Sequence, residues 1–391
     1  MMTMKETIDM VDKKKINRKN SLWEIIQMAT FIFSSQIGSG FFLLPSLLSR
    51  GGYLSFLVLA IVGLLAMITI HVFAQTGMGV AQIIEKSFGK QWSRIIYFIY
   101  WFISWFSTIV LFKELIGYTG LTEWNATLLE ISIWFLASTV NLWKLKYTVY
   151  IESMLTIMKF LPFIFLIIGY FISFPHSSTI INFEGINIKL FLRCMWLFVG
   201  IETGNIIGSN LEISKKNKKI GTYVGMSVVV LFYLISIIIS FFLVGNSVLQ
   251  NNMAPYFTMF LFAYKGLLSS TVIDYTLKLL VVLTLVGSIN SWTISSGYTA
   301  KECGEMGILP KVMMVKNRHG VPYVGIFVSS ILVLIFLLLC NSPNIYQITT
   351  NAIDISCCFF LLIYGMCLMA YGKSYVKKLY VKLFFLFIYK N

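Results

Sequence analysis

Hydrophobic residues in this chain gather in long blocks that short polar segments separate. Ten blocks are each long enough to cross the hydrocarbon core of a bilayer, which takes about 20 helical residues. These blocks cover residues 24–48, 53–75, 94–117, 126–143, 147–173, 190–208, 221–245, 270–300, 322–341 and 346–371. An eleventh block, 379–389, would barely cross. Because a strand exposed to lipid leaves backbone groups unsatisfied, the pattern predicts an all-α membrane protein of ten full spans and a short eleventh.

Two of the predicted spans are interrupted near their middle. The first contains Gln36-Ile37-Gly38-Ser39-Gly40, and the sixth contains Val199-Gly200-Ile201-Glu202-Thr203-Gly204. They stand at the same ordinal position in two sets of five spans, which is typical of a five-plus-five inverted repeat with discontinuous helices 1 and 6. The alternative is that these glycines allow close helix packing. Glu202 favours a binding site, because a carboxylate within the membrane is costly and usually functional.

The distribution of charge gives the predicted spans an orientation. Charged residues make up 12% of the chain and the mean hydropathy is +0.81, whereas soluble domains carry roughly 25% charged residues. The net charge of +15 arises mainly from Lys and Arg in the segments on one side, and the loops on the other side hold only Arg50, Lys189 and Lys265. The positive-inside rule therefore places the amino terminus in the cytosol and argues against nucleic acid as a partner. Residues 1–20 contain no apolar core of a signal peptide, so we expect a cytosolic segment there.

Other chemistry is sparse in the sequence. The six cysteines, which lie in or beside apolar blocks without metal-ligand spacing, are expected to be buried free thiols. We find no nucleophile–base set, metal cluster or phosphate-binding loop. The sequence therefore predicts neither an enzyme nor a bound metal or cofactor.

Three separated motifs resemble those of one transporter superfamily. They are the stretch Ile37 to Pro45 (IGSGFFLLP), the stretch Trp196 to Glu202 (WLFVGIE), and the stretch Gly287 to Pro322 with its Trp292, Thr299-Ala300-Lys301 and Gly307-Ile308-Leu309-Pro310. In this order they resemble the amino acid–polyamine–organocation superfamily, and are most similar to its basic amino acid and polyamine antiporters, such as arginine–agmatine exchangers. The resemblance covers residues 21–372 and implies a LeuT-like fold, in which helices 1 and 6 unwind around a central substrate and the bundle gives alternating access.

The interrupted helices would supply most of the substrate site. Backbone N–H groups of Gly38, Ser39 and Gly40, with the Ser39 hydroxyl, suit a substrate carboxylate, because glycine allows close approach and a helix amino terminus favours anions. The α-ammonium group of the substrate would contact free backbone carbonyls. We expect these carbonyls at Gln36, Ile37, Trp196 and Val199.

The side chain of the substrate would be held by aromatic and hydroxyl groups. Trp196 and Trp292 are expected to gate the site and to contact a cationic group through their indole faces, with anchoring at the lipid interface as the alternative. The family resemblance assigns Ser104 and Thr108, which share a helix face, to the distal pocket. On the tenth span, Asn351 and Asp354 lie on a polar face, where Asp354 would contact a cationic substrate, pair with Lys159 or line water.

Two intramembrane charges are candidates for coupling. By resemblance, Glu202 senses protons or links the gate to the site, and Lys159 takes the place of a sodium ion. The alternatives are a structural hydrogen-bonding carboxyl group and a snorkelling lysine, although Lys159 lies about a dozen residues from either end of its span. Lys113, Glu114 and Glu130 lie nearer to span ends and are interpreted as interfacial charges.

These patterns together predict a secondary active transporter of amino acids or polyamines in the cytoplasmic membrane. We expect sodium-independent exchange or proton coupling, with a small amine or amino acid, protons and the lipid bilayer as partners, and with a homodimer left open. The expected organisation is a cytosolic segment 1–20, a core 21–372 and a short partial helix 373–391. A transporter-fold receptor without turnover and a shortened inactive remnant are the alternatives.

Overall fold

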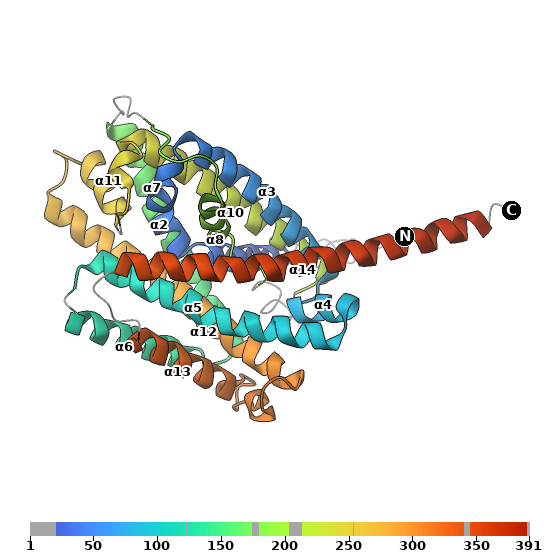
Figure 1. The fold of residues 1–391 in the computed structure, drawn as a ribbon. Coiled ribbons are helices and arrows are strands. Elements are labelled where there is room, and N and C mark those ends of the chain that lie inside the picture. Colours follow the sequence, from blue (N-terminus) through green and yellow to red (C-terminus); the bar gives the residue numbers. More distant parts are fainter. Residues whose placement is uncertain are drawn as a thin grey trace, which may run out of the picture.

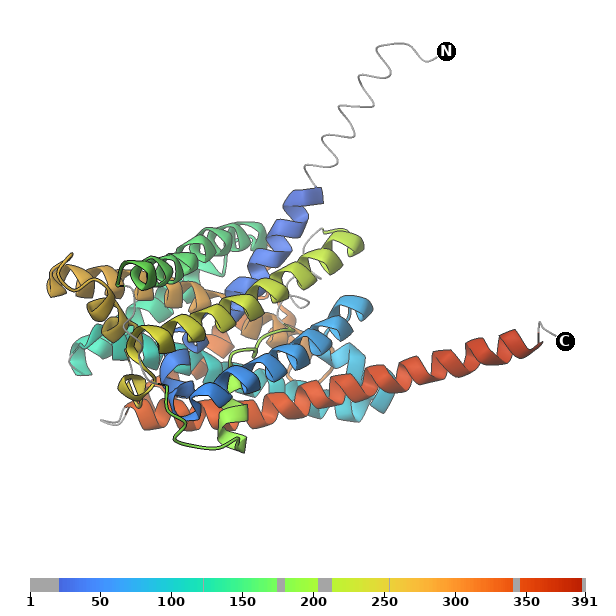
Figure 2. The same cartoon turned by 90° about the horizontal axis from the view of Figure 1, so that it is seen from above.

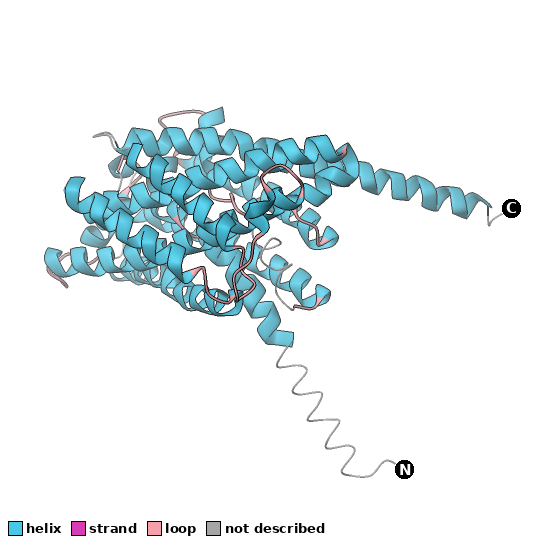
Figure 3. Cartoon of the chain, turned by 90° about the horizontal axis from the view of Figure 1, so that it is seen from below, coloured by secondary structure: helices cyan, strands magenta, loops and turns pink. Residues whose placement is uncertain are grey.

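The computed structural model describes residues 21–121, 123–173, 180–202, 213–252, 254–339 and 345–388, and within these ranges it forms no strand. The helices pack side by side into one elongated bundle (Figures 1 and 3). Its labelled helices are α2 (Ser39–Leu48), α3 (Tyr53–Thr76), α4 (Val80–Phe88), α5 (Lys90–Thr119), α6 (Glu123–Val140), α7 (Leu145–Ser173), α8 (Ile188–Trp196), α10 (Lys215–Val244), α11 (Pro255–Ala263), α12 (Ser270–Glu305), α13 (Tyr323–Leu339) and α14 (Ile345–Ile388), with short 3-10 turns at Ser49–Gly51, Ser247–Leu249 and Lys311–Met314. The predicted all-α class is confirmed.

Several single helices have the length and hydropathy of a membrane span. Five helices in the described ranges are long and apolar enough to cross a bilayer, and a bent pair raises this number to six. The shorter apolar helices Met158–Ser173 and Tyr323–Leu339 lie in the predicted fifth and ninth spans. The outer surface of the bundle is rich in exposed large apolar side chains such as Leu64 and Phe171, as expected of a surface in contact with lipid.

The first span is broken where the sequence predicts it. Helices Ser21–Gln36 and Gly40–Gly51 meet at an angle of 47°. The break allows tight packing, because a Cβ atom added at Gly38 would lie 2.9 Å from Ser288 Oγ and 3.0 Å from Leu111 Cδ2. A side chain at this position would push the broken segment away from α5 and α12.

The sixth span is also discontinuous. Helix α8 ends at Trp196, and residues 197–202 continue as turns. Gly200 has φ +101°, a value that residues with a Cβ atom rarely adopt. The second half of this predicted span, including Gly204, lies outside the described residues.

Helix α12 occupies the centre of the bundle. It packs along α5, α13 and α7, while α10 packs along α3, and α14 packs along α5 and α4. Figure 2 shows α3 and α10 running side by side on one flank of this core. The two helix breaks therefore lie among long continuous helices that hold them in place.

Helix α4 is a short segment that the hydrophobic blocks did not predict. Its Val80, Ala81, Ile83 and Ile84 are buried against the bundle, whereas Glu85 and Lys86 are exposed. This one-sided pattern with low overall hydropathy is typical of a helix that lies on a bundle rather than crossing a membrane.

The carboxyl-terminal end differs from the expected short separate helix 373–391. Helix α14 continues without a break from the tenth predicted span through Gly372 to Ile388. Its last turns extend past the other helices (Figures 1 and 2). No proline interrupts the polar stretch after Gly372, so the helical hydrogen bonds continue through it.

Candidate functional site

A small central cavity of about 20 Å³ lies at the two helix breaks. A cavity of this size has room for about one water molecule, so a larger ligand requires the residues at the two breaks to move apart. The residues that line it come from the broken first helix, from α5, from the sixth span and from α12. They are Ser35, Gln36, Gly38, Gly40, Ser107, Leu111, Trp196, Val199 and Trp292.

The lining includes most of the residues that the sequence assigns to the broken helices. Gln36, Gly38, Gly40 and Val199 border the cavity from the two breaks. Helix α2 begins at Ser39, so its amino-terminal end, where helices favour negative charge, faces the same space. The side chain of Ser39 lies outside the described atoms.

The two tryptophans lie in the protein interior. Trp196 and Trp292 both line the cavity, and each is 5% exposed. By contrast, Trp92, Trp124 and Trp143 are each more than half exposed. The structure therefore places Trp196 and Trp292 where they can contact a ligand, and not at the lipid interface.

The backbone carbonyls of the first break are already engaged. The carbonyl oxygen of Gln36 accepts a hydrogen bond of 2.6 Å from the Tyr233 hydroxyl, and that of Ile37 accepts one of 2.9 Å from Ser288 Oγ. A carbonyl oxygen has two lone pairs. Each of these two carbonyls therefore retains one acceptor site for the predicted contact with an α-ammonium group.

The side-chain amide of Gln36 is the clearest open polar group in the cavity. Both its oxygen and its nitrogen are buried, and neither has a hydrogen-bond partner in the described part of the chain. Leaving a buried polar atom unsatisfied costs about 1–3 kcal/mol. A ligand that both accepts from and donates to this amide would remove that cost.

Helix α5 presents a different face to the cavity from the one expected. Ser107 and Leu111 line it. Ser104 instead donates to the Trp101 carbonyl at 2.6 Å, and its Oγ lies 3.1 Å from Ser296 Oγ. Thr108 donates to the Ser104 carbonyl and borders a separate small cavity. The structure thus places both predicted pocket residues of α5 outside the central cavity.

Glu202 belongs to a hydrogen-bonded group beside the sixth-helix break. The Tyr364 hydroxyl of α14 donates to Glu202 Oε2 at 2.6 Å and accepts from the backbone N–H of Gly200 at 3.0 Å. Glu202 and Tyr364 are 0% and 3% exposed. One hydroxyl group therefore joins the carboxylate to the turn at which the helix unwinds. Sequence patterns do not indicate Tyr364, because it lies more than 160 residues away along the chain.

Lys159 reaches the break in the first helix from α7. Its Nζ donates to the carbonyl oxygen and to Oγ of Ser34, both at 2.6 Å, and to Ser288 Oγ at 2.9 Å. The Lys159 side chain is 0% exposed. The ammonium group therefore joins α7, the first span and α12 at one point, and it does not snorkel to the surface.

Asp354 and Asn351 lie away from the central cavity. The charged groups that act on Asp354 are Arg193 and Lys189 of α8, and not Lys159. Its Oδ1 has no hydrogen-bond partner among the described residues. Asn351 is exposed, because it lies on the opposite face of α14 from the core residue Ile353.

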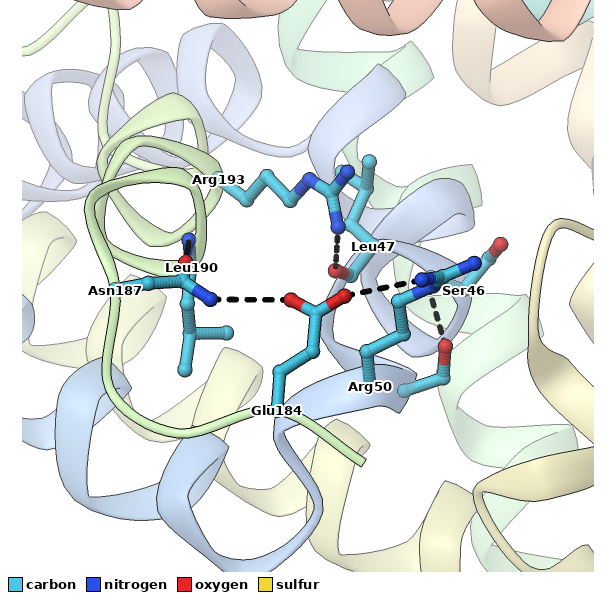
Figure 4. A network of polar contacts seen from close by, with 8 residues as sticks. Ser46, Leu47, Arg50, Glu184, Asn187, Leu190 and Arg193 are labelled. Atoms are coloured by element: carbon cyan, nitrogen blue, oxygen red, sulfur yellow. Dashed lines mark hydrogen bonds and ion pairs between the residues drawn. The ribbon is translucent and has the colours of Figure 1, made fainter. Parts of the chain in front are cut away.

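A polar network joins α8 and the segment before it to the end of α2 and the turn after it (Figure 4). Arg193 donates to the Leu47 carbonyl at 3.2 Å, and Arg50 pairs with Glu184 at 3.0 Å. Asn187 donates to Glu184 at 3.1 Å, and its oxygen caps the α8 N–H of Leu190. Hydrogen bonds from Arg50 and then from Asn187 lower the pKa of Glu184. The halves of both broken helices on this side are thus linked.

The described residues offer no candidate metal centre, since no three His, Cys, Asp or Glu side chains come together among them. The five described cysteines are free. Four are buried as expected, but Cys358 is exposed because it lies on the outer face of α14, and Cys340 lies outside the described residues.

Comparison with known proteins identifies relatives along nearly the whole chain. The model of the amino acid permease family matches residues 24–388. The putrescine transporter PotE of Haemophilus influenzae is 21% identical over 361 residues, which cover 87% of this chain and 82% of that protein. A putative arginine/ornithine antiporter of Bacillus subtilis is 22% identical over 366 residues, which cover 81% and 76%.

Solved structures show the same fold. Mhp1, a nucleobase-cation-symport-1 family transporter in a closed conformation with bromovinylhydantoin bound, matches with a TM-score of 0.57 at 13% identity over 84% of this chain and 74% of that one. A mutant manganese transporter of Eremococcus coleocola matches with a TM-score of 0.56 at 15% identity over 86% and 76%. The predicted LeuT-like transporter fold is therefore confirmed. The chain belongs to the amino acid permease family and is a multi-pass membrane transporter rather than an enzyme.

Proposed function

We propose that this protein moves amino acids or polyamines across the cytoplasmic membrane by alternating access, as a sodium-independent exchanger with its amino terminus in the cytosol. The observation that carries the proposal is the small cavity at the two helix breaks, lined by the unpaired Gln36 amide and by Trp196 and Trp292. The relatives named as putrescine transporters and as an arginine/ornithine antiporter support a cationic substrate.

The cavity has complementary groups for both ends of an amino acid. The amino-terminal end of α2 and the Gln36 amide nitrogen suit a carboxylate. The remaining lone pairs of the Gln36 and Ile37 carbonyls suit an α-ammonium group. The indole faces of Trp196 and Trp292 suit an ammonium or guanidinium group of the substrate side chain.

Lys159 supports sodium independence. Its ammonium group binds the Ser34 carbonyl and hydroxyl together with Ser288, a set of oxygen atoms that would otherwise suit a small cation. A covalently attached cation at this position leaves no room for a second one. We therefore propose that Lys159 replaces a transported sodium ion and holds the first-helix break against α12.

Glu202 supports a link between the cavity and the movement of the bundle. Tyr364 connects it to Gly200, and Gly200 in turn lies against the cavity residues Gln36 and Trp292. A change of bonding at Glu202 therefore acts on the turn that borders the ligand. We propose that Glu202 and Tyr364 couple ligand binding to the opening of the site, with Glu202 as the candidate proton acceptor.

Counterflow in proteoliposomes tests the proposal. Vesicles loaded with unlabelled putrescine, ornithine or arginine should accumulate the labelled compound transiently, and a neutral amino acid load should do so less. Accumulation should be the same with sodium or with choline in the buffer. Saturable binding without any counterflow would favour the receptor alternative and contradict transport, and a sodium requirement would contradict the role given to Lys159.

A further inference from the structure

Glu114 of α5 is a buried carboxylate that nothing in the described structure satisfies. The side chain is 0% exposed, and neither Oε1 nor Oε2 has a hydrogen-bond partner among the described residues. The neighbouring Lys113 is committed elsewhere, since it pairs with Glu130 of α6 at 3.0 Å. The interpretation of Glu114 as an interfacial charge is therefore wrong, because the side chain faces the protein interior.

Glu114 continues the face of α5 that lines the central cavity. Ser107, Leu111 and Glu114 are spaced at i, i+4 and i+7, which places them on one side of a helix, and the first two border the cavity. At 1.5 Å per residue, Glu114 lies about 4.5 Å beyond Leu111 along the helix axis. It is thus one turn from the ligand space, towards the end of α5 at Thr119.

Three buried tyrosines interact electrostatically with this carboxylate. They are Tyr118 of α5, Tyr233 of α10 and Tyr256 of α11. The Tyr118 hydroxyl donates to the Phe42 carbonyl, and the Tyr233 hydroxyl donates to the Gln36 carbonyl. The proton of each of these two hydroxyls is therefore already used, whereas Tyr256 has no partner in the described part of the chain.

Tyr233 also shows that this pocket adjoins the cavity. Its hydroxyl oxygen lies 3.2 Å from the position of a Cβ atom at Gly40, a residue that lines the cavity. The same hydroxyl oxygen contacts the Gln36 carbonyl. Leu111 and Tyr233 therefore connect the first-helix break with the surroundings of Glu114.

We infer that Glu114 binds the second cationic group of the substrate and so selects diamines and basic amino acids over neutral ones. This inference rests on the proposed transport function. The cavity lining itself carries no charged side chain, and Glu202, although its Oε1 has no partner among the described residues, is held through Oε2 by Tyr364. A buried carboxylate without a partner is unfavourable, and an ammonium or guanidinium group that enters with the ligand supplies the missing charge and hydrogen-bond donors.

Two pairs of ligands isolate this second cationic group. Ornithine and norvaline share a carbon skeleton and differ in the terminal ammonium group, as do putrescine and butylamine. We expect Glu114→Gln to weaken binding of ornithine and putrescine roughly ten- to a hundredfold, the range of a lost charge-assisted hydrogen bond. Binding of norvaline and butylamine should change less than about twofold, because these two ligands lack the second cationic group that Glu114 would bind. Calorimetry on the full chain in nanodiscs measures these constants.

Two further variants control for folding and for net charge. Glu114→Asp keeps the charge but withdraws it by one methylene group, so it should retain part of the preference for ornithine over norvaline. Glu305→Gln removes an equal charge from an exposed position and should leave all four constants unchanged. If Glu114→Gln does not yield folded protein, Glu114→Asp alone must weaken ornithine more than norvaline for the inference to hold.

The outcomes separate this inference from the proposed function. Equal weakening of ornithine and norvaline, or unchanged ornithine binding, would overturn the role of Glu114 while wild-type counterflow still supports transport. Equal affinity of the wild type for the two ligands would do the same. A wild-type protein that binds none of the four ligands and gives no counterflow would overturn the proposed function itself.

Discussion

Replacement of Tyr364 by phenylalanine removes one oxygen atom that holds two contacts. This hydroxyl donates to Glu202 Oε2 at 2.6 Å and accepts from the Gly200 N–H at 3.0 Å. The ring packs against Phe360 and should stay in place, because phenylalanine has the same shape. The substitution therefore leaves a buried carboxyl group and a buried N–H without their partner.

The expected cost follows from the two contacts. An orphaned buried N–H costs about 1–3 kcal/mol, and the lost bond to a carboxyl group costs about 1 kcal/mol if the group is neutral and about 1.5–3 kcal/mol if it is charged. Tyr364→Phe should therefore lower the free energy of unfolding by about 2–6 kcal/mol. Because both contacts involve one oxygen, Glu202→Gln in the Tyr364→Phe background should cost less than Glu202→Gln alone, with a coupling of about 1–3 kcal/mol.

Reversible unfolding in mixed micelles with SDS measures the four free energies of this double-mutant cycle. Tyr298→Phe is a matched control, because Tyr298 is 5% exposed and its hydroxyl has no hydrogen bond to any described residue. Its free energy of unfolding should stay within about 0.5 kcal/mol of wild type. Additive effects of Tyr364→Phe and Glu202→Gln, within about 0.5 kcal/mol, would refute the bridge between α14 and the sixth-helix break.

Three further predictions concern single contacts. Lys159→Met should lower the initial rate of counterflow by at least about tenfold, since the ammonium that joins Ser34 to Ser288 is lost; a fully active variant would make Lys159 structural. Gly200→Ala should cost at least about 1–2 kcal/mol of unfolding free energy, because φ is +101°; an unchanged SDS midpoint would contradict this. The lowered pKa of Glu184 means that its bonds stabilise the fold above its ordinary pKa of about 4.3 and are lost as the pH falls through the lowered value. Both Glu184 and Arg50 are partly exposed, so the loss of these bonds should cost less than about 1 kcal/mol of stability and lower the melting temperature only slightly. Glu184→Gln should abolish this part of the fall.

The sequence was sufficient to locate the two helix breaks. Glycines clustered at Gly38 and Gly200 in the middle of apolar blocks that otherwise lack breaks. A local signal of this kind is informative because a broken span requires residues that tolerate unusual backbone angles and close contacts. The structure shows the reasons at both positions: the Ser288 contact at Gly38 and the positive φ at Gly200.

The side of α5 that lines the cavity could not be predicted from the sequence of that helix alone. Serine and threonine occur on two sides of this helix, at Ser104 and Thr108 and at Ser107. Either side is compatible with a lining role, and the rotation of the helix is fixed by contacts with α12, α13 and α14 from distant parts of the chain. The spacing i, i+4 shows which residues share a face, but not which neighbour the face meets.

The burial of a charged residue near the end of a span could not be predicted from the sequence either. Glu114 lies only five residues before the end of α5, a position at which a charged side chain often reaches the membrane interface. In the folded protein, Glu114 is 0% exposed, and its charge acts on three buried tyrosines, Tyr118, Tyr233 and Tyr256. Distance along the helix indicates where the bilayer ends, whereas burial depends on what packs alongside.

The buried polar groups in and near the cavity fall into two classes: those that form hydrogen bonds within the protein and those that do not. Lys159 and Glu202 are bonded to the broken segments, so a change at either one moves the backbone at a break, as coupling requires. The Gln36 amide and the Glu114 carboxylate have no partner among the described residues. Because unsatisfied buried groups are unfavourable, a ligand that satisfies both the Gln36 amide and the Glu114 carboxylate gains more than a ligand that satisfies only one of them. A substrate with a polar head at Gln36 and a cationic group at Glu114 fulfils that condition, and a neutral amino acid does not.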